Sequence, residues 1–168
     1  ALGNADQGID IRSANNTIGG TTAADRNVIS GNTGEGVIIS TASAMGNVVL
    51  GNYIGLNAAG TAAIGNDYGV SISGGASNNT IGGTTAAARN VISGNQQAGV
   101  HLSDGATSNN VVQGNYIGTD ITGTLDLGNT NSGVLIGATN NTIGGNTAAA
   151  RNIIAGNDYA GIRLAGTA

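Results

Sequence analysis

The 168-residue sequence contains no cysteine, proline, tryptophan, phenylalanine or lysine, and its only aromatic residues besides one histidine are four tyrosines. The absence of cysteine excludes disulfides and thiolate metal sites and leaves the cellular compartment open. Without Phe or Trp, the interior must be filled by Ala, Val, Ile and Leu. This composition favours narrow, regular layers of small side chains over an irregular globular core.

Charge is also scarce. The formal net charge is −4, and the five positive residues, all Arg, are scattered along the chain. This distribution argues against a nucleic-acid partner, which requires a dense basic face. No apolar run approaches the length of a membrane span, and no secretory leader is visible. We therefore expect neither nucleic-acid binding nor membrane insertion.

What the sequence does contain is repetition. The phrase NNTIGG begins at Asn15, Asn78 and Asn140, a spacing of 63 and then 62 residues. Between these copies lies a second phrase, GNVVLGNYIG from Gly46 and NNVVQGNYIG from Asn109. Two alternating units therefore make up each long period. Such repeats indicate stacked modules that contact mainly their neighbours.

Each module is predicted to consist of short strands. The apolar runs are three to five residues long and β-branched, with alternation such as Val70-Ser71-Ile72, which is strand periodicity. Asn-Gly, the typical hairpin dipeptide, does not occur, which argues against antiparallel hairpins. Aligning the phrases predicts strands at about 69–73, 79–82 and 90–94. The predicted inward positions are Val70, Ile72, Ile81 and Ile92, followed one module later by Val100, Leu102, Val112 and Ile117.

The phrases NNTIGG, RNVISGN and GNYIG, in this alternation, resemble the right-handed parallel β-helix repeats of large secreted and surface-anchored bacterial proteins. The broad architecture is similar to that of pectate lyases. The expected fold is thus all-β, a single right-handed parallel β-helix (residues 1–168) with three short strands per rung and about five rungs. The resemblance implies an extracellular or cell-surface location. Both ends fall inside a repeat, so we expect either a segment of a longer array or a unit that stacks end to end.

The asparagines are predicted to occupy the corners between strands. Asn tolerates unusual backbone angles and can satisfy backbone polar groups, and stacked Asn amides can hydrogen-bond to one another from rung to rung. The candidates for such a ladder all open the third strand of a module, a position that the resemblance supports. They are Asn27, Asn52, Asn90, Asn115 and Asn152.

Candidate catalytic and metal-binding residues are few. His101 is predicted to face outward as a solvated residue, with Asp104 nearby, but no nucleophile or paired acid accompanies them. The loop acids are dispersed, whereas calcium requires several oxygens at one spot. The residues favour a non-enzymatic protein with no cofactor, and calcium remains an open alternative. These loop acids are Asp67, Asp120, Asp126 and Asp158.

Arg26, Arg89 and Arg151 occupy equivalent positions in alternate modules. They can form a row that binds acidic glycans, or each guanidinium can hold its own TTAAx loop through backbone carbonyls. The latter interpretation is favoured. The tyrosines form two equivalent pairs, Tyr53 with Tyr116 and Tyr68 with Tyr159, and are expected to pack beneath the long loops 56–68 and 119–132.

The sequence thus favours a structural, spacer or adhesive segment of an extracellular or cell-surface protein. Two alternatives remain open. One is a carbohydrate-binding or carbohydrate-active domain with a polysaccharide partner. The other is a filament subunit whose partner is itself, joined through the ends of the solenoid.

Overall fold

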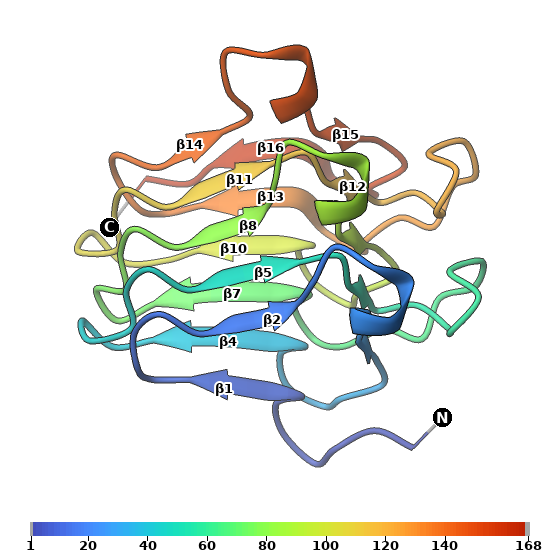
Figure 1. Cartoon of the computed structure of the whole chain (residues 1–168), viewed down its shortest axis with the longest axis horizontal. Helices are drawn as coiled ribbons and strands as arrows, with labels where there is room; N and C mark the ends of the chain where they lie inside the picture. Colours follow the sequence, from blue (N-terminus) through green and yellow to red (C-terminus); the bar gives the residue numbers. More distant parts are fainter. Residues whose placement is uncertain (1, 167–168) are drawn as a thin grey trace.

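The computed structural model describes residues 2–166, which form a parallel β-solenoid of three sheets (Figure 1). The first sheet contains β1 (Ile9–Ile11), β4 (Val37–Ser40), β7 (Val70–Ser73), β10 (Val100–Leu102), β13 (Ser132–Ile136) and β16 (Ala160–Leu164). The second contains β2 (Thr17–Gly19), β5 (Val48–Leu50), β8 (Thr80–Gly82), β11 (Val111–Gln113) and β14 (Thr142–Ile143). The third contains β3 (Val28–Ile29), β6 (Tyr53–Ile54), β9 (Val91–Ile92), β12 (Tyr116–Ile117) and β15 (Ile153–Ile154).

One strand from each sheet makes a rung, and successive rungs stack along one axis, from β1 at one end to β14, β15 and β16 at the other (Figure 1). There are five such rungs among the described residues, and β16 begins a sixth. Rungs one, three and five are called Arg rungs because they carry Arg26, Arg89 and Arg151. Rungs two and four are called Tyr rungs because they carry Tyr53 and Tyr116.

The register follows the alignment of the sequence phrases. Ile81 pairs with Val112 in the second sheet, and Ile92 pairs with Ile117 in the third, all in parallel strands. The predicted strands 69–73 and 79–82 correspond to β7 and β8. The predicted strand 90–94 is shorter in the structure, where β9 covers only Val91–Ile92. It ends there because Gly94 has a positive φ of 72° and turns the chain toward the next corner.

The core is one continuous column of small apolar side chains between the three sheets. The side chains at every predicted inward position from Val70 to Ile117 are completely buried. Because equivalent residues pair from rung to rung, Ile, Val and Leu lie on one another, at the inter-strand spacing of about 4.8 Å. At the two ends this column is partly uncovered: Ile9 and Ile18 are only partly buried, and Ile162 is 49% exposed.

The insertions occur at the predicted corners. In the Arg rungs the connection between second and third strands forms a short 3₁₀ turn: η1 (Ala23–Asp25), η2 (Ala86–Ala88) and η3 (Ala148–Ala150). In the Tyr rungs the long loops 56–68 and 119–132 follow the third strand and project from the same side of the solenoid (Figure 1). Each long loop is closed by an antiparallel bridge, Leu56 with Ala63 and Thr119 with Asp126.

Candidate functional site

The predicted asparagine ladder runs through all five rungs at the corner before the third strand. The Nδ2 of Asn27 donates to Oδ1 of Asn52 across 3.0 Å, and this pattern repeats from Asn52 to Asn90, Asn115 and Asn152 at 3.0–3.3 Å. Asn52, Asn90 and Asn115 are completely buried. All five predicted members therefore belong to one hydrogen-bonded column, as the sequence indicated.

Two further ladders, which were not singled out from the sequence, occupy the other two corners. Before the second strand of each rung, the column consists of Asn16, Asn47, Asn79, Asn110 and Asn141. Before the first strand, it consists of Asn4, Asn32, Asn66, Asn95, Asn129 and Asn157. The signal was present in the recurring Asn-Asn and Gly-Asn pairs, which repeat once per rung.

Each ladder amide also satisfies backbone groups. The backbone N–H of Asn79 donates to Oδ1 of Asn110 at 2.9 Å, and Nδ2 of Asn79 donates to the carbonyl of Ala44 at 3.0 Å as well as to Asn110. Among residues 2–166, no buried side-chain nitrogen or oxygen lacks a hydrogen-bond partner. The ladders therefore remove the penalty of burying the polar corners, about 1–3 kcal/mol for each unsatisfied group.

The ladders have a direction. In all three columns the amide donates toward the rung that follows in the sequence, and its Oδ1 accepts from the rung that precedes it. The end near β1 consequently presents Asn Oδ1 acceptors, and the end near β14 and β15 presents Asn N–H and Nδ2 donors. The two ends of the solenoid are chemically different.

Glycine accompanies the ladder where the backbone itself must approach a neighbouring rung. Gly82 has a φ of +93°, and a Cβ built there would lie 2.0 Å from the carbonyl oxygen of Gln113 and 2.5 Å from Oδ1 of Asn115. Any side chain at this position would thus collide with both the backbone and the ladder of the next rung.

The predicted arginine row is present, but its partners differ from those expected. The Nε of Arg26 donates to the carbonyl of Gly51, and that of Arg89 to Gly114, each at 3.2 Å. These acceptors lie in the following Tyr rung, and not in the arginine's own TTAAx loop as was favoured from the sequence. Each arginine hydrogen bond therefore joins an Arg rung to the tight corner of the following Tyr rung.

Each of these guanidinium groups also covers a tyrosine ring of the following rung. The Cζ of Arg26 lies 4.2 Å from the Tyr53 ring centroid, and that of Arg89 lies 3.9 Å from the Tyr116 centroid. The tyrosines pack under the long loops as predicted, since a Cβ at Gly60 or Gly123 would meet these rings at 3.0 Å. Arg rung and Tyr rung are thus joined by a cation–π contact, typically worth about 0.5–2 kcal/mol.

Arg151, the third member of the row, is exposed at the end of the stack, and no aromatic ring among residues 2–166 lies beneath its guanidinium. The three arginines are two rungs apart, about 9.6 Å. Whether the row binds an acidic glycan remains a prediction. Two of its three members are occupied by contacts within the solenoid.

His101 points outward, as predicted, but it is half-buried rather than solvated. Its ring stacks on Tyr68 with the centroids 4.9 Å apart and the planes at 18°. Burial lowers the pKa of His101 below its ordinary value of 6.5, and the negative charge of Glu35 opposes this shift. The sequence could not reveal this contact because Tyr68 belongs to the preceding rung.

The second tyrosine pairing predicted from the sequence is wrong. Tyr68 corresponds to Ser132 and Ala160 in the parallel register, because Gly69, Gly133 and Gly161 are aligned. Ala160 is an additional residue between Tyr159 and Gly161, so Tyr159 is shifted by one position. Its exposed ring instead contacts Arg163, whose Cζ lies 5.0 Å from the ring centroid.

Asp104, considered with His101 as a catalytic candidate, serves a structural purpose. It sits at a positive φ of 61° and accepts hydrogen bonds from the backbone of Gly74 in the preceding rung and from Thr107. Although burial acts to raise the pKa of Asp104, these hydrogen bonds outweigh it and lower that pKa. Asp104 therefore fastens one corner to its neighbour.

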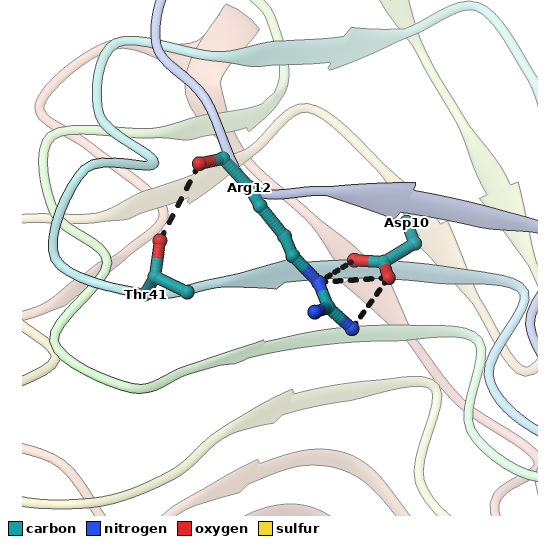
Figure 2. A network of polar contacts seen from close by, with 3 residues as sticks. All are labelled: Asp10, Arg12 and Thr41. Carbon is teal, nitrogen blue, oxygen red and sulfur yellow. Dashed lines mark hydrogen bonds and ion pairs between the residues drawn. The ribbon is translucent and has the colours of Figure 1, made fainter.

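At the end of β1, a small polar network joins Asp10 and Arg12 to Thr41, which follows β4 in the second rung (Figure 2). Arg12 donates to Asp10 on the same face of the chain at 2.9 Å, and Thr41 donates to the Arg12 carbonyl at 3.4 Å. The ion pair raises the pKa of Arg12. Because the Arg12 side chain is 70% exposed, solvent screens this pair and it adds little to stability.

The loop acids do not converge. Among the described residues, no group of three or more His, Asp or Glu side chains is placed to hold a metal ion. Asp120 accepts hydrogen bonds from the backbone of Thr124 and Leu125 and from the Thr122 hydroxyl, all within its own loop. Asp67, Asp126 and Asp158 lie in separate turns. Their carboxylates therefore do not form a calcium site.

Two hollows lie at the ends of the solenoid. The larger, about 460 Å³, is beside β14 and β15, and the smaller, about 170 Å³, is beside β1 and β3. No helix within residues 2–166 has the length and apolar character needed to cross a membrane. A comparison with known protein families, curated proteins and solved structures finds no match to this chain.

Proposed function

We propose that this chain is a non-enzymatic, rigid spacer segment of an extracellular or cell-surface protein, of the kind found in bacterial β-helix proteins with pectate-lyase-like architecture. The observation that carries the proposal is the continuity of the three asparagine ladders. They run through every rung at every corner with no interruption. A fold that repeats one cross-section in this way supplies length and stiffness.

The contacts of the outward side chains support this role. Arg26, Arg89 and Asp104 bind neighbouring rungs, and Tyr53 and Tyr116 are held between arginines and long loops. These are side chains that a glycan-binding or catalytic surface would need to have available. Instead they form contacts between rungs and stabilise the stack. These contacts do not favour the alternative of a carbohydrate-binding or carbohydrate-active domain.

The spacer role is tested by lengthening the solenoid. Duplicating residues 66–128 in frame adds one Arg rung and one Tyr rung, because Asn66 and Asn129 occupy the same ladder. We expect the solenoid to lengthen by about 9.6 Å along its stacking axis, seen as an increased radius of gyration in small-angle X-ray scattering, with an equal or higher melting temperature. A scrambled insertion of the same length is the matched control and should not extend the rod.

Two results would contradict the proposal. One is a duplication variant that folds without elongation. The other is saturable binding or cleavage of an acidic polysaccharide by the original chain, together with loss of that activity when Arg26 and Arg89 are replaced by Ala.

A further inference from the structure

The corner between the first and second strands of every Arg rung carries the triplet Asn-Asn-Thr. This triplet has the pattern Asn-x-Thr, in which the first Asn is an acceptor for an N-linked glycan and the Thr belongs to the recognised sequence. Because the pattern is short, the exposure and contacts of its side chains decide whether the folded chain can carry a glycan there. The three copies are Asn15-Asn16-Thr17, Asn78-Asn79-Thr80 and Asn140-Asn141-Thr142.

The second asparagine of each triplet belongs to a ladder and cannot be modified in the folded chain. Asn79 is completely buried, and its Nδ2 donates to Oδ1 of Asn110 and to the carbonyl of Ala44. A glycan on this nitrogen would have to replace both hydrogen bonds and enter the corner between two rungs. The second asparagine is also followed by Thr-Ile, and so does not itself begin an Asn-x-Thr pattern.

The first asparagine of each triplet has the opposite environment. Asn15, Asn78 and Asn140 are exposed and occupy turns with a positive φ of 56–61°. Nδ2 of Asn78 donates only to the hydroxyl of the adjacent Ser77. Within residues 2–166, Nδ2 of Asn15 and Nδ2 of Asn140 form no hydrogen bond. The fold therefore leaves these three amide nitrogens available.

The threonine of the triplet is not required by the solenoid either. Thr80 pairs with Val48 and Val111 of the two neighbouring Tyr rungs, so the same outward position accepts a side chain without a hydroxyl. The backbone N–H of Thr80 donates to the preceding rung. Within residues 2–166, the hydroxyls of Thr17, Thr80 and Thr142 form no hydrogen bond.

Rung four contains the same corner without the acceptor pattern. Asn109 is exposed and has a φ of 57°, and Asn110 after it belongs to the ladder. The third position is Val111. The chain thus contains an internal control, in which the geometry of the acceptor is present and the threonine is not.

We propose that Asn15, Asn78 and Asn140 are acceptor sites for N-linked glycans, attached by an oligosaccharyltransferase during export of the chain. Nδ2 attacks the anomeric carbon of a lipid-linked diphospho-oligosaccharide. A carbon–nitrogen bond forms, the bond from the anomeric carbon to the diphosphate oxygen breaks, and Nδ2 loses one proton as the lipid diphosphate leaves. This inference goes beyond the spacer role, and it rests on the extracellular location in the proposed function.

The three glycans would form one row along the solenoid, because the acceptors lie two rungs apart, about 9.6 Å. The row follows the corner between the first and second sheets. None of the three acceptors is a ladder member, so all three columns of hydrogen bonds remain complete in the glycosylated chain.

Secretion of the 168-residue chain from eukaryotic cells, behind a cleavable leader, tests the proposal. Peptide N-glycosidase converts each glycosylated Asn to Asp, and mass spectrometry of the peptides locates each conversion. We expect conversion at Asn15, Asn78 and Asn140, and none at Asn109. Because the leader supplies the export route, a negative result bears on the acceptor sites, whereas the duplication variant tests the spacer role separately.

Two variants exchange the rung types at this corner. Thr80→Val should abolish conversion at Asn78 alone, with the melting temperature of the unglycosylated chain unchanged, since the Tyr rungs already carry Val at this position. Val111→Thr should create a fourth acceptor at Asn109.

Four results would overturn the proposal. They are the absence of conversion at all three predicted sites, conversion at Asn109 in the original chain, no conversion at Asn109 in the Val111→Thr variant, and a glycosylated chain that no longer unfolds cooperatively.

Discussion

The Nδ2 of Asn90 donates to Oδ1 of Asn115 across 3.0 Å, although the two residues are 25 positions apart in the sequence. Asn90 also accepts from the backbone of Asn52 and donates to the carbonyl of Val49 at 2.8 Å. One completely buried side chain thus connects three successive rungs.

Replacing Asn90 by Ala should lower the free energy of unfolding by about 1–3 kcal/mol, because several buried groups lose their partner at once. Chemical denaturation measures this loss. Asn146→Ala is the control: Asn146 is exposed in a surface turn, and its replacement should cost under about 0.5 kcal/mol. Equal shifts of the two midpoints would show that the ladder contributes nothing to stability.

Gly82→Ala should destabilise the chain by about 2–4 kcal/mol, since the new Cβ requires both a strained backbone and movement of the Gln113 carbonyl. The matched variant is Gly105→Ala, where a Cβ meets nothing within 4 Å and φ is not positive. That variant should be neutral or slightly stabilising. Thermal unfolding of both proteins distinguishes the two sites, and a stable Gly82→Ala protein would contradict the close approach of these rungs.

Arg89 and Tyr116 should be energetically coupled. A double-mutant cycle with Arg89→Ala and Tyr116→Leu is expected to yield a coupling of about 0.5–2 kcal/mol. The Arg151→Ala single variant should change stability by less than about 0.5 kcal/mol, because no ring lies beneath Arg151 in the described chain. Strictly additive effects of Arg89→Ala and Tyr116→Leu in urea unfolding would exclude a cation–π contribution.

Stability should decline as pH falls through the range of histidine titration. Because burial lowers the folded-state pKa of His101 below 6.5, the fold favours the neutral ring. This contribution is fully present above pH 6.5, the ordinary value, and is lost as pH falls through the folded-state pKa. The melting temperature should therefore decrease between about pH 7.5 and pH 5.

Two variants isolate this effect. His101→Gln should flatten the profile in that range, and Glu35→Gln should steepen it, since the negative charge of Glu35 partly compensates the protonated ring. An identical slope in the original chain and in His101→Gln would show that His101 does not control the pH dependence.

Much of the fold could be read from the sequence because a solenoid is locally determined. The repeated phrases predicted the pairing of Ile81 with Val112 and of Ile92 with Ile117, since identical modules stack in register. The alternation around Ser71 and His101 identified the buried side chains, and the recurrence of Asn27, Asn52, Asn90, Asn115 and Asn152 identified one ladder. In most folds the pairing of residues far apart in the sequence cannot be read from the sequence. Here the repeated phrases reveal it.

Only the tertiary structure determined which side chains meet between rungs. Arg26 and Arg89 bind carbonyls and tyrosines of the following rung, and Tyr68 stacks on His101 of the next rung. One additional residue before Gly161 moved Tyr159 away from the position that its sequence context indicated. The sequence repeat determines the backbone, because equivalent residues of successive rungs occupy equivalent positions. Contacts between neighbouring outward side chains depend instead on side-chain length, rotamer and single-residue shifts, which become defined only when the rungs are stacked about 4.8 Å apart.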